Sequence, residues 1–418
     1  MSMTRRQWLA MAGLASVAPQ FVSRAYAAPG AADSRFLLVF LRGAYDAANV
    51  VAPVGASFYQ ESRPTIALKK FDPADPQAAI ELSGQWGLHP ALRDSMLPLW
   101  QKNQLAFVPF AGTDDLTRSH FETQDSVEEG LPLDGPRDYG SGFLNRLSQA
   151  MGGRAAPVAF TDGLPIVLKG DIVVPNVSLK GTGKPPFDDR QSGLLTSMYK
   201  GTRFESLIAE GFDLRKTVAE QAEAQQREVE AARNNVSTDR MNEMVAASKQ
   251  ALTAKGFEVE ARRMAGLMKD RFNLGFIDVG GWDTHVNQGG ATGQLASLLS
   301  NLGSGLSGFA NEMGPMWDKT VVVVLSEFGR TFRENGTKGT DHGHGSVYWV
   351  LGGSVRGGKL LGDQVAIERA KLNQDRDWPV LTEYRAMLGG LFQRMYGLDD
   401  ARLAQVFPNA RPRDIGLV

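Results

Sequence analysis

Five runs of apolar residues along the chain predict buried β-strands. They cover residues 35–41, 105–110, 272–279, 321–324 and 347–351, and none is long enough to span a membrane. Amphipathic helix patterns lie between them, at 91–102 and at 294–313, where leucines recur at helical spacing. Strands that alternate with helices predict an α/β fold with a parallel sheet and right-handed crossovers.

The middle of the chain has a different pattern, rich in Gly and Pro and then strongly polar. We expect short strands at 159–168 and 172–179, followed by a long charged helical segment at 204–255. We therefore predict a first half of the α/β core at 35–151, an inserted mixed strand and helix cap region at 152–258, and a second half at 259–412 that ends in helices near 381–396. An extended interaction helix is the alternative for the polar segment.

The N-terminal segment has the pattern of an export signal. Arg5 and Arg6 form a twin-arginine pair, a short apolar stretch follows, and Ala25-Tyr26-Ala27 is an A-x-A cleavage site. Residues 1–27 are therefore predicted to be a twin-arginine signal peptide. This makes the twin-arginine export machinery a partner, places the mature protein in the periplasm or outside the cell, and leaves no stable membrane span after cleavage.

Charge and cysteine content narrow the possible chemistry. The formal net charge is −1, so the composition gives no argument for a nucleic-acid partner. The chain has no cysteine, which removes both disulfides and thiolate metal ligands. Any metal must therefore be held by oxygen and imidazole nitrogen, a donor set that suits Zn²⁺ or Mn²⁺ better than Mg²⁺ or Ca²⁺ when histidine takes part.

Carboxylates and histidines follow the predicted strands, where α/β proteins build their sites. The candidate metal ligands are Asp46, Asp283, His285, Glu327, Asp341 and His342, with His344 close by in sequence. A cap or turn explains Asp46 equally well, and a turn Asp beside a packed His is the structural alternative for 283 and 285. His89 is expected to pack near a helix start. The ligands could hold one ion or two. Two ions about 4 Å apart could clamp the attacking and leaving oxygens of a phosphate or sulfate ester.

Ser119 has two interpretations. Ser119 and Glu122 match a capping box, which explains both residues structurally and is favoured by the spacing alone. Alternatively, Ser119 is a nucleophile at a helix N-terminus, with Arg118, Arg330 and Arg42 offsetting the charge of an anionic substrate.

Five short motifs resemble the domain-of-unknown-function 1501 family. They are Leu-Arg-Gly-Ala-Tyr-Asp at 41–46, Ser-His-Phe at 119–121, Gly-Gly-Trp-Asp-Thr-His at 280–285, Ser-Glu-Phe-Gly-Arg at 326–330 and Asp-His-Gly at 341–343. That family resembles the alkaline phosphatase and sulfatase superfamily. The resemblance implies a doubly wound, mostly parallel sheet with helices on both faces, and metal ligands at the strand ends.

The resemblance also implies roles for single residues. It makes Asp46 the first-strand ligand, Ser119 (rather than Thr117) the nucleophile, and Asp283 with His285 a ligand pair; Glu327, Asp341 and His342 complete the set. One departure is that Ser326-Glu327 stands where the superfamily has adjacent Asp-His.

These observations favour an exported, metal-dependent hydrolase of phosphate or sulfate esters that acts on a small anionic ester or a polysaccharide. Two alternatives remain open. One is a non-catalytic envelope protein that binds or scaffolds on the same fold. The other is a transferase, in which an acceptor alcohol replaces water.

Overall fold

Strand β1 (Arg35–Leu41) runs through the interior of an eight-stranded sheet, as its seven consecutive buried residues require. The structure is a computed structural model that describes residues 34–177, 189–202, 205, 208–209, 211–212 and 252–418. The predicted signal peptide, 1–27, and most of the predicted polar helix, 204–255, lie outside the described residues.

The central sheet has the order β10-β5-β9-β8-β1-β7-β6, and β11 also pairs with β5. All its pairs are parallel except those of β9, which runs antiparallel to β5 and β8. The other strands are β5 (Leu105–Gly112), β6 (Pro157–Ala159), β7 (Leu274–Val279), β8 (Thr320–Ser326), β9 (Ser346–Leu351), β10 (Lys359–Leu360) and β11 (Thr382–Glu383). A small antiparallel sheet contains β2 (Val51–Ala52), β3 (Ile80–Ser83) and β4 (Trp86–Leu88).

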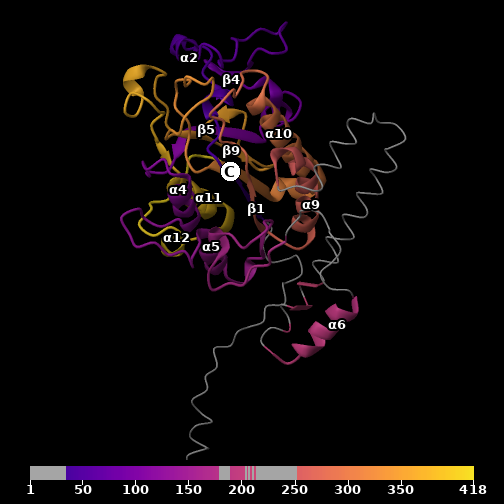
Figure 1. Cartoon of the computed structure of the whole chain (residues 1–418). Helices are drawn as coiled ribbons and strands as arrows, with labels where there is room; N and C mark the ends of the chain where they lie inside the picture. The colour runs from indigo at the N-terminus through magenta and orange to yellow at the C-terminus, as the bar shows by residue number, and fades with distance from the viewer. Residues whose placement is uncertain (1–33, 178–188, 203–204, 206–207, 210, 213–251) are drawn as a thin grey trace, which may run out of the picture.

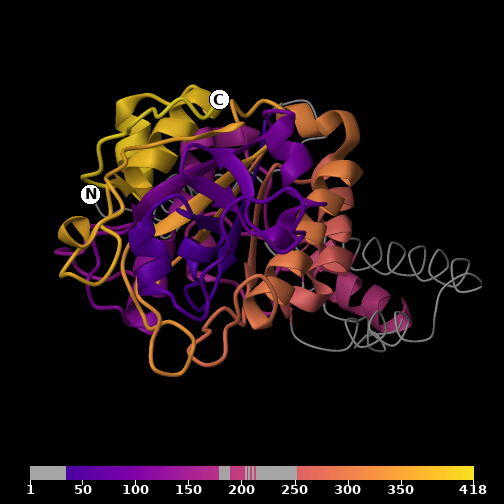
Figure 2. The same ribbon diagram turned by 90° about the horizontal axis from the view of Figure 1, so that it is seen from above.

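Helices cover both faces of the central sheet (Figures 1 and 2). Alternate residues of β1 point to opposite faces, so Leu37 and Val39 pack in one hydrophobic cluster with α9 and α10. Phe36 and Leu38 pack in a second cluster with α5, α11 and α12. The α-helices are α2 (Ser57–Ser62), α3 (Leu97–Gln101), α4 (His120–Glu129), α5 (Phe143–Met151), α6 (Asp189–Met198), α9 (Phe257–Asp270), α10 (Gln294–Met313), α11 (Tyr384–Tyr396) and α12 (Asp400–Val406).

Short 3₁₀ helices complete the described elements. They are Ala47–Asn49, Pro90–Leu92, Gly152–Arg154, Ile166–Leu168, Ala254–Gly256, Gly314–Lys319 and Arg369–Lys371. None of the described helices is long and apolar enough to cross a membrane.

The predicted fold class, a doubly wound and mostly parallel α/β sheet with helices on both faces, is confirmed. The strands expected at 35–41, 105–110, 272–279, 321–324 and 347–351 form within a few residues of their predicted limits, and helix α10 has the bounds read from the sequence. Figure 2 shows the C-terminal helices α11 and α12 and the α9–α10 pair on opposite sides of the strands.

Two local predictions are wrong, and proline is the reason in both. The expected helix at 91–102 splits into the 3₁₀ turn Pro90–Leu92 and α3, because Pro98 lacks the N–H that a continuous helix would use. Of the strand expected at 159–168, only Ala159 lies in a strand, at the end of β6. Gly163 and Pro165 interrupt the rest, and 166–168 is a 3₁₀ turn.

The region predicted as an insertion contributes to the core. Strand β6 pairs with β7 and forms an edge of the central sheet, although it lies within 152–258. The strand expected at 172–179 is absent from its described part, where Asn176 makes only an isolated bridge to Ala159. The limits of the predicted cap region stay a prediction.

Candidate metal centre

The candidate site lies where the sheet topology brings several loops together. Strands β1, β7 and β8 are parallel neighbours, so their carboxyl ends meet at one edge of the sheet. Strand β9 runs the other way, and therefore the loop that precedes it, with His342, arrives at the same edge. Helix α4 begins with His120 a few residues after β5 ends.

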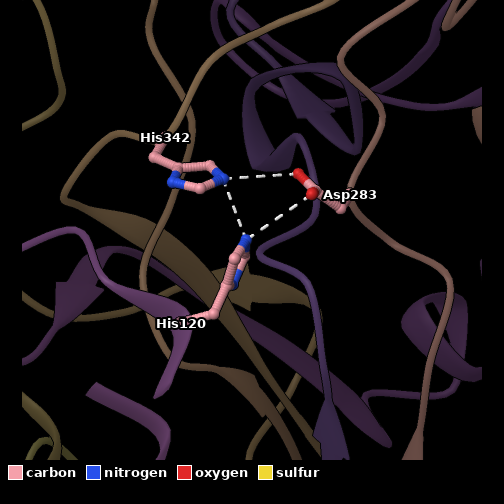
Figure 3. Close-up of side chains that lie close together, drawn as sticks. All are labelled: His120, Asp283 and His342. Atoms are coloured by element: carbon pink, nitrogen blue, oxygen red, sulfur yellow. Dashed lines mark hydrogen bonds and ion pairs between the residues drawn. The ribbon is translucent and has the colours of Figure 1, made fainter. Parts of the chain in front are cut away.

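Three side chains from three of these segments converge (Figure 3). His120, Asp283 and His342 each offer a ligand atom, and these atoms lie within 4.8 Å of one another. The two histidine Nε2 atoms are 2.9 Å apart. The Asp283 carboxylate is 3.5 Å from His342 Nε2 and 3.7 Å from His120 Nε2.

The hydrogen bonds on the far side of each ring assign the tautomers. His120 Nδ1 lies 2.7 Å from Glu327 Oε1, and an ionised carboxylate can only accept, so Nδ1 carries the proton. His342 Nδ1 lies 3.0 Å from the Arg118 carbonyl oxygen, which also only accepts. In the neutral rings, both Nε2 atoms therefore point lone pairs at each other.

His285 adds a third imidazole to this arrangement. Its Nδ1 is 3.1 Å from Asp341 Oδ1, and its Nε2 lies 3.1 Å from His342 Nε2 and 2.9 Å from Asp283 Oδ1. His285 thus lies between two carboxylates, Asp341 on its Nδ1 side and Asp283 on its Nε2 side, and either nitrogen can donate to the carboxylate it faces.

The Nε2 lone pairs of neutral His120 and His342 therefore face each other, with the Asp283 carboxylate and the His285 Nε2 atom beside them. Acceptors that face each other at about 3 Å repel unless a cation lies among them. Imidazoles oriented by carboxylates or carbonyls through the opposite nitrogen are typical of metal-binding histidines. The donor set thus fits a divalent ion, and among the described residues no other group of this kind occurs.

The electrostatic environment favours the metal-binding protonation states. Burial opposes ionisation of Asp283, but the Arg330 hydrogen bond and charge outweigh it and lower its pKa. Burial likewise opposes the ionisation of Glu327, whose pKa is nevertheless lowered by hydrogen bonds from His120 and Gln124. For His342, burial and the neighbouring His120 and Arg330 lower the pKa and favour the neutral ring.

Glu327 is built into the fold rather than exposed to solvent. It directly follows β8, is fully buried, and accepts from the Gly43 N–H at 2.9 Å and from Gln124 Nε2 at 2.8 Å. Gly43 has φ +114°, and a Cβ there would lie 2.8 Å from the Asp283 nitrogen, so only glycine allows this close approach of the two loops.

Arg330 acts as a clamp between loops. Its guanidinium donates to the carbonyls of Gly43, Ala44, Trp282 and Thr340 and to the Asp283 carboxylate. The sequence suggested that it binds an anionic substrate, but its side chain is fully buried and its donors are used within the protein. Its role in this structure is to fix the loops after β1 and β7.

Arg118 is similarly engaged. Its guanidinium lies 2.6 Å from Asp377 Oδ2 and also donates to Gln374, while its backbone, at φ +54°, presents the carbonyl that accepts from His342. The side chain expected to bind an anion therefore faces an aspartate, and the main chain serves the cluster.

The N-cap part of the Ser119 interpretation is confirmed, whereas the Ser119 N–H donates to Thr117 Oγ1 at 3.4 Å, where a capping box would use the Glu122 side chain. Ser119 is the N-cap of α4, and its side chain accepts from the Glu122 N–H at 3.5 Å. Its sequence neighbour His120 is in the cluster, whereas Thr117 Oγ1 lies 3.3 Å from Thr123 Oγ1. The role of Ser119 as a nucleophile stays a prediction.

Asp46 does not join the cluster. It is fully buried against Arg63, with guanidinium-to-carboxylate distances of 2.5 and 2.9 Å. The two remaining histidines also lie elsewhere. His89 caps the turn that starts at Pro90, as expected, and burial lowers its pKa to about 4. His344 is buried beside Asp115.

The family comparison agrees with the motifs on which the site is built. The family described as "Protein of unknown function (DUF1501)" matches residues 33–407, which is most of the chain. The chain belongs to this DUF1501 family. No curated protein matches it.

Several solved structures are distantly similar to this DUF1501 chain. A protein of the alkaline phosphatase superfamily from Vibrio parahaemolyticus is 10% identical with a TM-score of 0.36, over 87% of this chain and 66% of that one, so this chain spans just under two thirds of its length. The lipoteichoic acid synthase LtaP from Listeria monocytogenes is 8% identical with a TM-score of 0.36, over 92% and 76%. Ps i-CgsB in complex with k-i-k-neocarrahexaose is 9% identical with a TM-score of 0.37, over 92% and 75%.

Sequence reasoning missed one member of the cluster of this DUF1501 protein. The sequence does not predict His120 as a ligand, because the adjacent Ser119 already accounts for this position as a helix cap or a nucleophile. A signal was present, since His120 opens a helix just after strand β5, as the other candidates follow strands. Of the six predicted ligands, Asp283 and His342 lie in the cluster, His285 adjoins it, and Glu327 and Asp341 orient its histidines.

Proposed function

We propose that this DUF1501 protein is an exported, metal-dependent hydrolase of phosphate or sulfate esters. The observation that carries the proposal is the convergence of His120, His342 and Asp283, joined by His285, with every histidine Nδ1 committed to an acceptor. A cation held by the Nε2 atoms would remove the repulsion between their facing lone pairs.

Each part of the site has a defined task in this proposal. The three histidines and Asp283 hold a divalent ion, preferably Zn²⁺ or Mn²⁺, while Glu327 and Asp341 fix the ring orientations. Such an ion would supply Lewis acidity, polarising a phosphoryl or sulfuryl oxygen and lowering the pKa of a water molecule. The cluster side chains are 21–43% exposed, which leaves room for a small anionic ester or the end of a polysaccharide.

Ser119 is the proposed nucleophile. It precedes His120 directly and caps the ten-residue helix α4, whose N-terminal amides and dipole favour an anionic group. Its Oγ would form the bond to phosphorus or sulfur as the alcohol leaves, and water would then release the phosphate or sulfate. Export rests on the twin-arginine pattern at Arg5 and Arg6 and on the A-x-A site.

The test combines metal analysis with an ester screen. The purified protein, stripped with a chelator and reloaded with Zn²⁺ or Mn²⁺, is assayed on nitrophenyl phosphate and sulfate beside His342→Gln. His344→Gln is the matched control, since it changes a histidine two positions away that lies outside the cluster. We expect metal-dependent turnover in the wild type and the control only. A fully loaded protein that cleaves neither class of ester would contradict the enzyme and favour a binding protein.

A further inference from the structure

Asp46, in the loop after β1, and Arg63, directly after α2, form a buried ion pair. The Asp46 oxygens lie 2.5 and 2.9 Å from the two terminal guanidinium nitrogens, and both residues are fully buried. A bidentate pair of this kind is the strongest geometry that an arginine makes with a carboxylate.

Both members of the pair make further hydrogen bonds inside the protein. Arg63 also donates to the carbonyls of Phe332 and Thr331 and to Asn49 Oδ1, and Asp46 Oδ2 accepts from Gln288 Nε2 at 2.6 Å. Burial alone would lower the pKa of Arg63, but the charge and hydrogen bonds of Asp46 outweigh it and raise that pKa. The guanidinium is therefore a permanent cation in this place.

A metal ion bound to Asp46 would have to displace this cation. Arg63 would then be left charged in the interior without a counter-ion, because its side chain has 0% exposure. Removing one partner from a buried ion pair is strongly destabilising, far more so than replacing both partners. The structure thus opposes a second ion at this carboxylate.

We propose that Arg63 is the fixed cation of Asp46 and that the site consequently takes one divalent ion per chain instead of two. This inference rests on the proposed function, which left the number of ions open. Asp46 is a positioning residue in this assignment and not a metal ligand.

The ion pair also supports the loop that carries the ligands. Gln288, which donates to Asp46, accepts from Thr284 Oγ1 at 2.8 Å and from Thr340 Oγ1 at 3.1 Å. Thr284 lies between the ligand Asp283 and His285, and Thr340 directly precedes Asp341. The network therefore connects a permanent internal cation to two of the three segments that supply the cluster, those with Asp283 and His342.

The experiment measures how many ions the wild-type chain binds. The chelator-stripped protein is titrated with Zn²⁺ by calorimetry, and the reloaded protein is checked by elemental analysis. We expect one ion per chain, unchanged in Asp46→Asn and lost in Asp283→Asn. Asp46→Asn should lower the melting temperature but retain the ion. Substitution of a true metal ligand would lose the ion as well.

Two further variants keep the test decisive if Asp46→Asn fails to fold. Asp46→Leu with Arg63→Met removes both charges together, and Arg63→Met alone leaves Asp46 unpaired. The double variant is expected to be more stable than Arg63→Met alone and to bind one ion.

The outcomes separate this inference from the proposed function. Two ions per chain in an active wild type, or a halved metal content in Asp46→Asn, would overturn the inference while the hydrolase proposal stands. No bound ion after reloading would overturn both.

Discussion

The Nε2 atoms of His120 and His342 face each other across 2.9 Å, and each ring uses its opposite nitrogen to donate a proton elsewhere. Two neutral imidazoles cannot form a hydrogen bond in this state, so the contact is unfavourable unless a cation lies between the lone pairs. The fold enforces the contact, since His120 starts helix α4 and His342 precedes strand β9.

Removing His120 should remove the metal. His120→Gln takes away one of the converging nitrogen donors, so we expect near-complete loss of bound Zn²⁺ after dialysis, with little change in secondary structure. His344→Gln is the control and should keep its ion. Elemental analysis measures the bound Zn²⁺ per chain in both variants. An unchanged metal content in His120→Gln would exclude that histidine from the metal centre.

Weakening the orientation of His120 should weaken binding without abolishing it. Glu327→Gln keeps the shape but loses the charged acceptor for Nδ1, and changes of this kind typically cost about 10–100-fold in metal affinity. Competition with a chromophoric chelator measures the constant. An affinity equal to that of the wild type would show that the 2.7 Å contact of Glu327 with His120 does not tune the site.

Ser119 can be tested with a variant that keeps the helix cap. Asn is as good an N-cap as Ser but offers no hydroxyl, so Ser119→Asn should retain stability and metal while it loses turnover. Ser119→Ala should lose turnover and, in addition, about 1 kcal/mol of stability. If Ser119→Asn is as active as the wild type, Ser119 is a cap only.

Arg330 should contribute strongly to stability. Arg330→Met leaves four carbonyls and the Asp283 carboxylate without their donor, and the loss of one partner from a buried charged network costs about 3–5 kcal/mol. Arg333, three positions on, is exposed and stacks over Phe58, so Arg333→Met is the control and should have a much smaller effect. Chemical denaturation monitored by tryptophan fluorescence measures both, and equal losses would refute the clamp.

Glu260 should make the fold less stable as the pH rises. It is buried on α9, and burial raises its pKa to about 7 in spite of Arg263 at 3.3 Å. The folded protein thus holds the proton more tightly than the unfolded chain, whose carboxyl titrates near 4.5. This contribution to stability is complete below pH 4.5 and disappears as the pH passes 7, a loss of about 3 kcal/mol.

Glu260→Gln should therefore flatten the stability profile between pH 5 and 8 relative to the wild type. Glu258→Gln, on the exposed side of the same helix, should leave the profile unchanged. Thermal melts across that pH range provide the comparison, and parallel profiles for wild type and Glu260→Gln would contradict the raised pKa.

Much of the fold could be predicted from the sequence, because its strands and helices follow from local patterns of apolar residues. Val321–Val324 and Leu37–Leu41 are continuous apolar runs that only a buried strand explains, and the leucine stripe of 294–313 is one helix face. Parallel strands then bring their carboxyl ends together, which is why Asp283, after β7, could be predicted as a ligand; His342 reaches the same edge because it precedes the antiparallel strand β9.

The rest depends on contacts between distant segments. His120 is oriented in the cluster by Glu327, 207 positions away, and no local pattern encodes that pairing. Asp46 looked like a ligand because it follows a strand, but its partner Arg63 lies in a loop after a short helix. Arg330 binds mainly backbone carbonyls, which composition does not reveal.

The most direct test of the account is to locate the ion. Anomalous diffraction from crystals of the Zn²⁺-loaded protein, measured above and below the metal's absorption edge, should show one strong peak in contact with His120 Nε2, His342 Nε2 and the Asp283 carboxylate. A peak bound to Asp46, or no peak among the three side chains in a fully reloaded crystal, would contradict the account.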